Sequence, residues 1–355
     1  MKNIGNIVNP VYKKQIEQFL NTLLVKTKED FSSTGKWSQQ VVDSLLPFIT
    51  GGKMIRGCLV LFIYHAYGKK ISKDAIRIAV AVELFHTGLL IHDDIMDNDL
   101  VRRGQPTIFA QYQLLGEVEK ITDSYHFGQS MGMCVGDIIF FLGFQVLSEI
   151  SDSDMKQYLM KLYTKELMNV GFAQMQDVYA GYTSKDFLPQ QIENLYKNKT
   201  GRYTFSLPMM LGTLFAKQKQ IEIKKVEILG EKMGILYQLI DDQLNLFGNE
   251  TETGKPVGSD VRENKKTVYR AYLYRIASEN QRKKLRSIFG NSQVTSVDLV
   301  YVKDLMLSLG VQEIIERRIN KFVADSEKII RKLSVSQENK KTMLQLLSYL
   351  KERKQ

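Results

Sequence analysis

The chain has 355 residues, of which 44% are apolar and 25% are charged, so it is long enough and apolar enough to bury a large core. The two cysteines, Cys58 and Cys134, exclude a disulfide framework and a cysteine-rich zinc site, and their apolar surroundings predict that both are core residues. The net charge of +10 is compatible with a nucleic acid, an anionic membrane or an acidic substrate, but the basic residues are dispersed along the chain, and we expect no nucleic-acid partner.

Apolar residues recur with the period of an α-helix from end to end, and no convincing strand alternation interrupts them. Helices are predicted, in chain order, at 11–24, 40–49, 55–67, 73–96, 125–150, 155–180, 190–196, 202–215 and 226–247. Because no long linker separates them, the predicted fold class is all-α, a single large helical bundle over residues 1–355. The charged segment 313–355 is expected to form a final helical pair packed on the bundle, with a coiled-coil partner there as the alternative.

The N-terminus lacks the apolar core of a signal peptide. The longest apolar stretches, at 127–148 and 205–216, are interrupted by Asp137 and Pro208 and do not resemble membrane spans. We therefore expect a cytoplasmic protein without a transmembrane segment.

A cluster of aspartates ends a strongly apolar predicted helix, in the run His92-Asp93-Asp94-Ile95-Met96-Asp97. Asp93 and Asp97 are four residues apart and share a helix face, where two carboxylates repel each other unless a cation compensates them. Carboxylates at a helix C-terminus also oppose the helix dipole, which disfavours a plain solvated helix end. Oxygen ligands favour Mg²⁺, which takes one or two carboxylates together with substrate phosphates.

A second acidic pair, Asp241-Asp242, lies deep in another apolar helix, and Asp241 shares a face with Asn245. Alone, this pair is as compatible with a structural role as with a functional one. Two such pairs on two apolar helices suggest facing walls of one cavity, in which metal ions hold a polyphosphate.

Cations suited to phosphate accompany both acidic motifs. Arg102-Arg103-Gly104 follows the first motif, and Gly51-Gly52-Lys53-Met54-Ile55-Arg56 opens a helix, where free N–H groups favour anions. Further cations near predicted helix ends, each of which is by itself more typical of a solvated surface, are Lys199, Arg202, Lys255, Lys265 and Lys266.

Taken together, these residues resemble the trans-isoprenyl diphosphate synthase (polyprenyl synthetase) family, and its geranylgeranyl-type members in particular. The resemblance runs from about residue 51 to about residue 267 and leaves further helices in 268–355. The motifs that carry it are GGKxxR at Gly51–Arg56, a histidine at His86, DDxxD at Asp93–Asp97, RRG at Arg102–Gly104, KTG at Lys199–Gly201, FQxxDD at Tyr237–Asp242 and GKxxGxD at Gly254–Asp260, followed by Lys265. GQxxD matches in part, at Gln174 and Asp177, and Asn245 replaces the last aspartate of the second DDxxD.

The resemblance implies a fold of the isoprenoid synthase type with a central substrate cavity, and a Mg²⁺-dependent condensation of isopentenyl diphosphate with an allylic diphosphate. It implies three Mg²⁺ ions bound by Asp93, Asp97 and Asp241, with Arg102, Lys199 and Lys255 on the allylic diphosphate. Isopentenyl diphosphate is expected on Lys53, Arg56, His86 and Arg103, with Lys265 as a further diphosphate contact. Lys199, Thr200 and Gln238 are expected to stabilise an allylic cation, and a homodimer is the common state of the family.

Helix geometry suggests how product length is set. Phe85, Leu89 and Asp93 form one row at intervals of four residues, so the growing prenyl tail is expected to run down this helix, away from the metal ions. Gly88 is predicted to leave open space, and Phe85, roughly 12 Å below Asp93, is predicted to be the floor. The predicted product is geranylgeranyl diphosphate or somewhat longer.

Three alternatives remain at this point. A class I terpene cyclase shares the fold, but Asp241-Asp242 and the Lys53–Arg56 segment argue against it. A non-catalytic helical partner subunit would typically have lost the acidic motifs that this chain retains. A basic helical scaffold for RNA or membrane is the third, and salt-sensitive RNA binding would support it.

Overall fold

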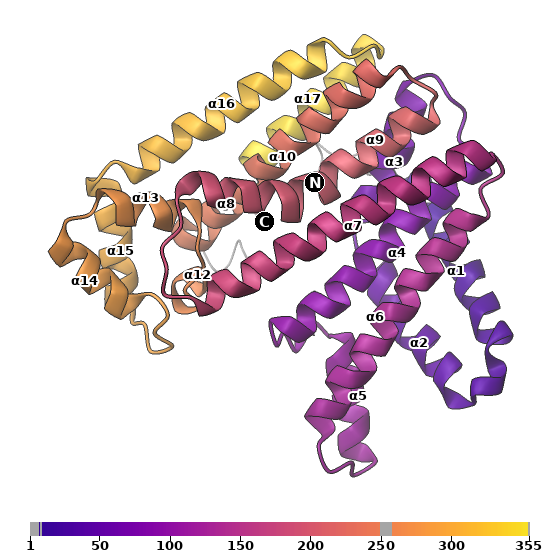
Figure 1. Ribbon diagram of the computed structural model, residues 1–355, viewed down its shortest axis with the longest axis horizontal. Coiled ribbons are helices and arrows are strands. Elements are labelled where there is room, and N and C mark those ends of the chain that lie inside the picture. The colour runs from indigo at the N-terminus through magenta and orange to yellow at the C-terminus, as the bar shows by residue number, and fades with distance from the viewer. Residues whose placement is uncertain (1–6, 8, 249–257, 354–355) are drawn as a thin grey trace. The chain divides into compact units, whose positions relative to one another are not determined.

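The computed structural model describes residues 7, 9–248 and 258–353, and these residues are almost entirely helical (Figure 1). The prediction of an all-α fold is confirmed. The elements are, in chain order, α1 (Pro10–Asp30), η1 (Ser32–Thr34), α2 (Lys36–Thr50), α3 (Ile55–Ala66), α4 (Lys73–Met96), β1 (Val101–Arg102), β2 (Gln105–Pro106), α5 (Ile108–Val118), α6 (Ser124–Ser148), α7 (Ser153–Tyr182), α8 (Pro189–Tyr196), η2 (Lys197–Ser206), α9 (Leu207–Phe215), α10 (Gln220–Phe247), α12 (Ser259–Arg262), α13 (Val268–Ile276), α14 (Glu279–Ile288), α15 (Ser296–Ser308), α16 (Val311–Arg331) and α17 (Gln337–Glu352).

Helix α5 was not predicted from the sequence, and neither was the short antiparallel hairpin of β1 and β2, in which Arg102 pairs with Gln105. The loop of this hairpin is Arg103-Gly104, with φ of 54° and 74°. Two positive φ values in a two-residue loop are typical of a type I′ turn, which explains the glycine of the Arg-Arg-Gly sequence.

The chain divides into two compact units. Unit 1 comprises residues 1–162 and 211–218, and unit 2 comprises 163–210 and 219–355. The chain passes between the units within α7, within α9 and again just before α10. A single domain over the whole chain stays a prediction, and each unit is described by itself.

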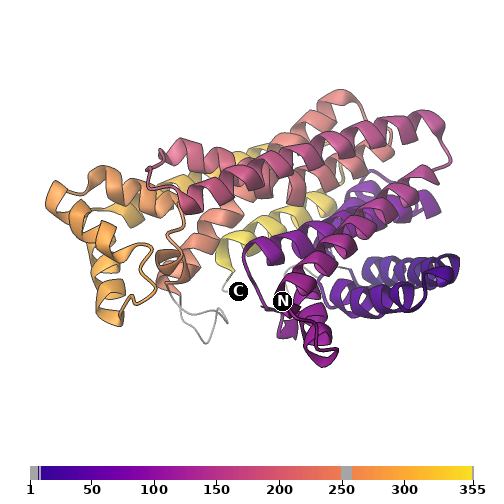
Figure 2. The same cartoon turned by 60° about the horizontal axis from the view of Figure 1, so that its bottom comes forward.

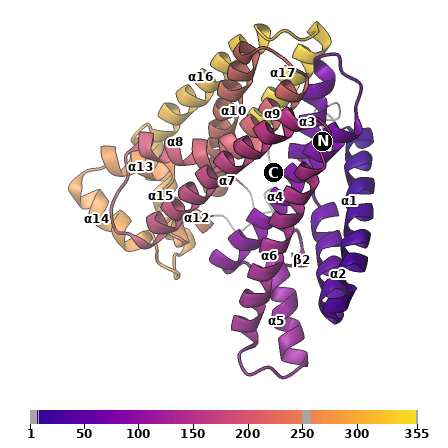
Figure 3. The same ribbon diagram turned by 45° about the vertical axis from the view of Figure 1, so that its right-hand side comes forward.

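In unit 1, α4 is the central helix and packs against α3 and α6, while α1 and α2 lie side by side (Figure 3). The N-cap of α4 is Ser72, whose side chain accepts a hydrogen bond from the Ala75 N–H. Most α4 residues between Ala75 and Ile91 are buried, which explains why this helix is apolar on nearly every side.

Helices α4 and α6 are long and apolar enough, by length and composition, to cross a membrane. This differs from the expectation that Asp137 interrupts the apolar stretch. Asp137 lies in α6, but one aspartate does not lower the mean hydropathy of this helix below that of a membrane span. For α4 the apolar composition is accounted for by burial within unit 1. Helix α6 instead leaves a row of side chains exposed, namely Met133, Cys134, Ile138 and Phe141.

Cys134 belongs to this exposed row, so the prediction that both cysteines are core residues is wrong for Cys134. Cys58 is buried in α3, as predicted. The apolar neighbours of Cys134 in sequence reflect an exposed apolar stripe and not a core position.

In unit 2, α10 is the central helix and packs against η2, α16 and α17. Helices α16 and α17 are the predicted C-terminal pair (Figure 1). The helices α13, α14 and α15 form a smaller group at one end of this unit, seen in orange in Figure 2. The C-terminal end of α17 brings Arg353 onto α10, where the second acidic motif lies.

Candidate active site

The first acidic motif occupies the last turn of α4, with Asp97 as the C-cap. The Asp97 N–H donates to the Asp93 carbonyl at 2.9 Å, so the two residues keep their helical spacing at the helix end. Asp93 is half-buried and Asp97 is exposed. The motif therefore presents two carboxylates, four residues apart, at the end of an otherwise buried helix.

Asp94 has a different role from its neighbour. It is buried and accepts from the Arg102 Nε at 2.5 Å, which fixes the β1–β2 hairpin to the end of α4. Burial raises the pKa of Asp94 to about 6, opposed by the adjacent guanidinium. Arg102, expected on the allylic diphosphate, is thus held beside the first acidic motif by Asp94 and, at 3.6 Å, by Asp99.

Of the residues predicted to bind isopentenyl diphosphate, Arg56 and Arg103 lie close enough to His86, in unit 1, to shift its pKa. The guanidinium of Arg103 lies so close to Gly52 that a β-carbon there would be 2.9 Å from its Nη1. Arg103 also donates to the Phe48 carbonyl at 3.4 Å, at the end of α2. A glycine at position 52 therefore lets the guanidinium of Arg103 approach the backbone of the Gly-Gly-Lys turn.

His86 lies near the guanidinium groups of three arginines. Its pKa is well below the usual value because of burial and the charges of Arg56, Arg103 and Arg102. The imidazole is therefore neutral at physiological pH. Three guanidinium groups acting on one imidazole indicate a strongly positive site, suited to a multiply charged anion.

Glu83 is the acidic counterpart in this region. It is buried and accepts from the Gly57 N–H at 2.6 Å, at the start of α3. Burial raises its pKa, and Arg56 and Arg103 oppose that shift. Glu83 thus anchors the helix that carries Arg56, a role that the sequence did not reveal. Lys53, in contrast, is exposed.

The predicted chain-length residues lie on α4 next to α6. The open space predicted at Gly88 is not there, because a β-carbon at Gly88 would be 2.7 Å from Cε1 of Phe140 and 2.9 Å from Cγ2 of Ile139. Phe85 is fully buried, and Leu89 is half-buried. Glycine at position 88 serves the close approach of α6.

In unit 2, Asp241 of the second acidic motif forms an ion pair with Arg353 from the end of α17. The Arg353 guanidinium also lies over the ring of Tyr237, 3.8 Å from its centroid. The side chain of Asp241 is 41% exposed, whereas that of Arg353 is 5% exposed. A protein cation thus lies on the carboxylate that was predicted to bind Mg²⁺.

The other polar residues of the second motif bind protein groups. Asp242 is buried and accepts from the Tyr196 hydroxyl at 2.5 Å, and burial raises its pKa well above the usual value. The Tyr196 oxygen accepts in turn from the Val268 N–H at 3.2 Å. Asn245 donates to Asp260 at 3.3 Å, so an amide at position 245 supplies a donor that an aspartate would lack.

The Lys-Thr-Gly residues lie in η2, a π-helical segment, and such segments are frequent at functional sites. Lys199 Nζ lies 2.5 Å from Asp177 Oδ2 on α7. The Thr200 hydroxyl donates to Gln238 Oε1 on α10 at 3.0 Å. The structure thus brings Lys199 next to Asp177 of the partial GQxxD match, and Thr200 next to Gln238.

Glycines allow η2 to approach α10 closely. A β-carbon at Gly234 would be 2.0 Å from the Cα of Gly201, and one at Gly230 would be 2.3 Å from the Ser206 nitrogen. Of the other predicted lysines, Lys265 lies 3.1 Å from Glu263 and 3.8 Å from Asp260, and Lys255 lies outside the described residues.

The residues that are present fit Mg²⁺. Within 7, 9–248 and 258–353, no group of three or more His, Cys, Asp or Glu residues is gathered for a metal ion. Each acidic motif instead offers one or two exposed carboxylates, which is the ligand number typical of a Mg²⁺ ion completed by substrate phosphates and water. At Asp241 the guanidinium of Arg353 already pairs with the carboxylate.

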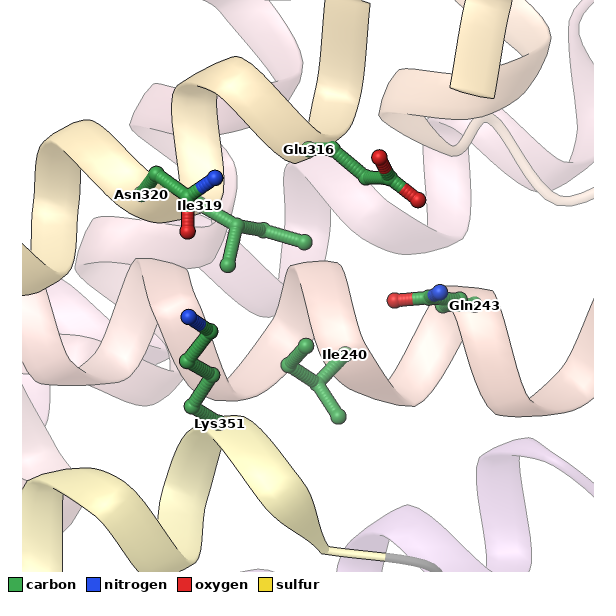
Figure 4. A pocket seen from close by; sticks show the side chains of 6 residues that line it. All are labelled: Ile240, Gln243, Glu316, Ile319, Asn320 and Lys351. Atoms are coloured by element: carbon green, nitrogen blue, oxygen red, sulfur yellow. The ribbon is translucent and has the colours of Figure 1, made fainter. Parts of the chain in front are cut away.

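A pocket of about 320 Å³ lies beside α10 but contains none of the predicted site residues (Figure 4). It is lined by Ile240, Gln243, Glu316, Ile319, Asn320 and Lys351. Lys351 comes two residues before Arg353. At the end of α17, Lys351 therefore lines this pocket while Arg353 pairs with Asp241.

Comparisons with known proteins agree with these motifs. The sequence model of the polyprenyl synthetase family matches residues 36–306. A short-chain isoprenyl diphosphate synthase of Methanocaldococcus jannaschii is 31% identical over 252 residues, or 70% of each chain. A geranylgeranyl diphosphate synthase of Saccharolobus solfataricus is 29% identical over 271 residues, or 75% of each chain.

The fold has close counterparts among solved structures. A geranylgeranyl pyrophosphate synthase from Corynebacterium glutamicum, complexed with isoprenyl diphosphate and magnesium, superposes with a TM-score of 0.87. It is 23% identical, and the match covers 96% of this chain and 98% of that one. A match over 96% of the chain includes residues beyond position 306, where the family model ends.

Proposed function

Because the chain belongs to the polyprenyl synthetase family, we propose that it is a prenyltransferase that condenses isopentenyl diphosphate with an allylic diphosphate in a head-to-tail, 1′-4 elongation. The observation that carries this proposal is the positive site of unit 1, where Arg56, Arg102 and Arg103 act on His86 directly below Asp93. A site for a second diphosphate is what distinguishes a chain-elongating enzyme from a cyclase, which uses one diphosphate substrate.

In this mechanism, Arg56, Arg103 and the neutral His86 hold isopentenyl diphosphate. Positive charge on the arginines binds the diphosphate, and the uncharged imidazole donates a hydrogen bond without adding a further charge to be repelled. Lys53 is exposed and is suited to capture the substrate from solution.

The allylic diphosphate is assigned to Asp93, Asp97 and Asp241 through Mg²⁺, which acts as a Lewis acid on the leaving diphosphate when bound. Three ions per site is the number that the family resemblance implies. Arg102, Lys199 and Lys255 neutralise further charge, and Lys265 is the additional contact. The Thr200 and Gln238 oxygens, which lie on neighbouring helical segments, stabilise the allylic cation through their dipoles.

We assign geranylgeranyl diphosphate as the product, or a somewhat longer prenyl chain. A cytoplasmic homodimer is the proposed state. The exposed row Met133, Cys134, Ile138 and Phe141 on α6, which flanks the exposed Asp137, supports the dimer, because exposed apolar side chains gathered on one helix are typical of a protein interface. Nucleic acid is not among the proposed partners.

The test is incubation with isopentenyl diphosphate, Mg²⁺ and allylic primers of several lengths, followed by separation of the products by chain length. We expect elongated products that require both substrates and Mg²⁺. The matched variants are Arg56→Met and Lys26→Met, since Lys26 lies in α1 outside the proposed site. The first should raise KM for isopentenyl diphosphate at least tenfold, and the second should leave it unchanged. Release of diphosphate from the allylic substrate alone, with cyclic products, would contradict the proposal.

A further inference from the structure

Arg202, in the π-helical segment η2, is the centre of an ionic network within unit 2. Its Nε and Nη2 atoms donate to the two carboxylate oxygens of Glu166 on α7, at 2.8 and 2.6 Å. Its Nη1 atom donates to Glu231 at 2.6 Å and to Glu227 at 3.1 Å, and both of these residues lie on α10. One guanidinium therefore connects η2 to two helices at once.

This network is mostly buried. The Glu166 side chain is 1% exposed and that of Arg202 is 13% exposed, and Lys224, 2.7 Å from Glu227, is the second cation beside the three carboxylates. Buried ion pairs often stabilise a fold no more than well-packed apolar side chains would. A bidentate guanidinium does, however, fix the direction in which its partners lie. We therefore look for the contribution of Arg202 in the geometry of η2.

On α7, the network works together with a second ion pair. Lys199, three residues before Arg202, pairs with Asp177 of the same helix. Glu166 and Asp177 are eleven residues apart, so they lie on one face of α7 and about 16 Å apart along its axis. Lys199 and Arg202 therefore extend in opposite directions along α7, and η2 is held between the two points.

The two ends of this arrangement differ in exposure. The side chains of Lys199 and Asp177 are 29% and 41% exposed, whereas Glu166 is inaccessible to solvent. Lys199 is thus able to exchange Asp177 for a diphosphate oxygen while the Arg202–Glu166 pair stays in place.

On α10, Arg202 and Thr200 contact the same face. Arg202 binds Glu231, and the Thr200 hydroxyl donates to Gln238, seven residues further along α10. The backbones touch between these contacts, at Gly201 and Gly234. The position of the Thr200 oxygen therefore depends on how η2 is placed along α10, and the guanidinium of Arg202 fixes that placement.

We propose that Arg202 is a positioning residue, which through Glu166, Glu227 and Glu231 fixes η2 so that Lys199 meets the allylic diphosphate and Thr200 meets the allylic cation. This inference rests on the proposed prenyltransferase function. Arg202 already donates four hydrogen bonds to carboxylates, so it acts through its neighbours in η2 and not on the substrate.

The experiment compares the full-length wild type with Arg202→Met and with the double variant Arg202→Met, Glu166→Met. The single variant leaves Glu166 buried without its partner, so its unfolding temperature should fall. The double variant removes that charge and should regain most of the lost unfolding temperature. If Arg202 positions η2, kcat stays at least tenfold below the wild type in both variants. KM for isopentenyl diphosphate should stay within twofold, because the proposed site for that substrate lies in unit 1.

Hydrogen exchange measured by mass spectrometry gives a second readout, which does not depend on activity. We expect the amides of residues 197–206 to exchange at least tenfold faster in the double variant, while those of 311–331, in α16, keep their wild-type rate. Lys232→Met is the matched control, since Lys232 follows Glu231 on α10 but pairs with Asp325 of α16 at 3.1 Å. Its kcat and its exchange in 197–206 should match the wild type.

A double variant that regains wild-type kcat together with its stability would show that Arg202 only compensates charge, and would overturn the inference. Unchanged exchange in 197–206 would overturn it as well. Arg202→Lys serves if neither variant folds, because it keeps the charge without the bidentate geometry; the same loss of kcat is expected, and wild-type kcat would contradict the inference. A wild type that elongates no primer would overturn the proposed function, while the exchange of 197–206 still decides whether Arg202 fixes η2.

Discussion

At Asp241, a carboxylate assigned to Mg²⁺ is paired with Arg353, a residue 112 positions further along the chain. No local pattern connects the two, and Arg353 has no special place in the sequence. Sequence reasoning identified Asp241 from its spacing to Asn245 and its apolar helix, but the partner of a charged side chain depends on tertiary structure. Under the proposed function, Mg²⁺ and Arg353 compete for this one carboxylate.

Replacing Arg353 with methionine should therefore tighten Mg²⁺ binding at the second motif. The ion pair is partly solvated at Asp241, so its contribution is about 1 kcal/mol, or roughly a fivefold change. We expect the Mg²⁺ concentration that supports half-maximal pyrophosphate binding, measured by titration calorimetry, to fall by about that factor in Arg353→Met.

Lys351→Met is the control for this prediction, because Lys351 lies on the same helix but lines the neighbouring pocket. Its Mg²⁺ dependence should match the wild type. Equal shifts in both variants would mean that the general positive charge of α17 matters and the Asp241 pair does not.

Lys266 illustrates a residue whose burial could not be foreseen, because it was one of several lysines near a predicted helix end. It is only 7% exposed, and burial and the charge of Arg270 lower its pKa to about 8. In the unfolded chain, Lys266 keeps its proton up to about pH 10.5. Between about pH 8 and pH 10.5 the folded protein therefore binds fewer protons than the unfolded chain, and its free energy of unfolding rises with pH.

Lys266→Met should remove this dependence. At pH 7 the variant avoids a buried charge, so it should be more stable than the wild type by up to about 3 kcal/mol. At pH 9.5 the advantage should be much smaller. Urea unfolding at the two pH values measures both quantities, and an equal stability difference at pH 7 and pH 9.5 would contradict the assignment.

At the scale of elements, the period of apolar residues predicted most helices of the first 247 residues within a few positions. It missed α5, and it could not reveal that η2 is π-helical, since a π-helix differs from an α-helix in its hydrogen-bond spacing and not in its composition. The β1–β2 hairpin was also missed, because two-residue strands carry no alternation. Its turn was nevertheless visible in Gly104.

The close packing of η2 on α10 depends on the absence of side chains. Gly234→Ala would place a carbon 2.0 Å from the Gly201 Cα, so the two backbones would have to separate. We expect a loss of at least about 2 kcal/mol in unfolding free energy, together with a fall in kcat as Thr200 moves away from Gln238. Thermal unfolding and steady-state kinetics test the two effects.

Gly171→Ala is the appropriate comparison. Gly171 lies inside α7, and a β-carbon there would meet nothing within 4 Å. Alanine is the better helix former by about 1 kcal/mol, so this variant should be as stable as the wild type or more so. If both substitutions destabilised the protein equally, close packing at Gly234 would not be the cause.

At the scale of the whole molecule, the family followed from a series of short motifs in a fixed order, and the family match over residues 36–306 bears it out. Composition by itself indicated only a chain able to bury a large core, and the period of its apolar residues indicated the all-α fold. The division of the chain into two units, with one acidic motif in each, was not predicted, because helical periodicity is the same on both sides of the division.

The exposed row on α6 leads to a prediction about assembly. Phe141 is 70% exposed, and Ile138 lies one turn before it. Introducing two charges, as Ile138→Glu with Phe141→Glu, should convert a dimer to monomers in sedimentation velocity by placing like charges in a buried interface. Val118→Glu, at another exposed position, should leave the dimer intact. A monomeric wild type would contradict the prediction, as would a wild type that sediments only with lipid vesicles.

The two cysteines of this chain differ in exposure, because Cys134 belongs to the exposed row on α6 and Cys58 does not. Cys58 is buried, and burial raises the pKa of its thiol, so it resists alkylation while the protein is folded. Cys134 is exposed on α6 among the apolar residues assigned to the interface. A maleimide fluorophore should thus attach at a single place per native polypeptide, and the rate of its attachment would report, without any substitution, how often that surface is uncovered.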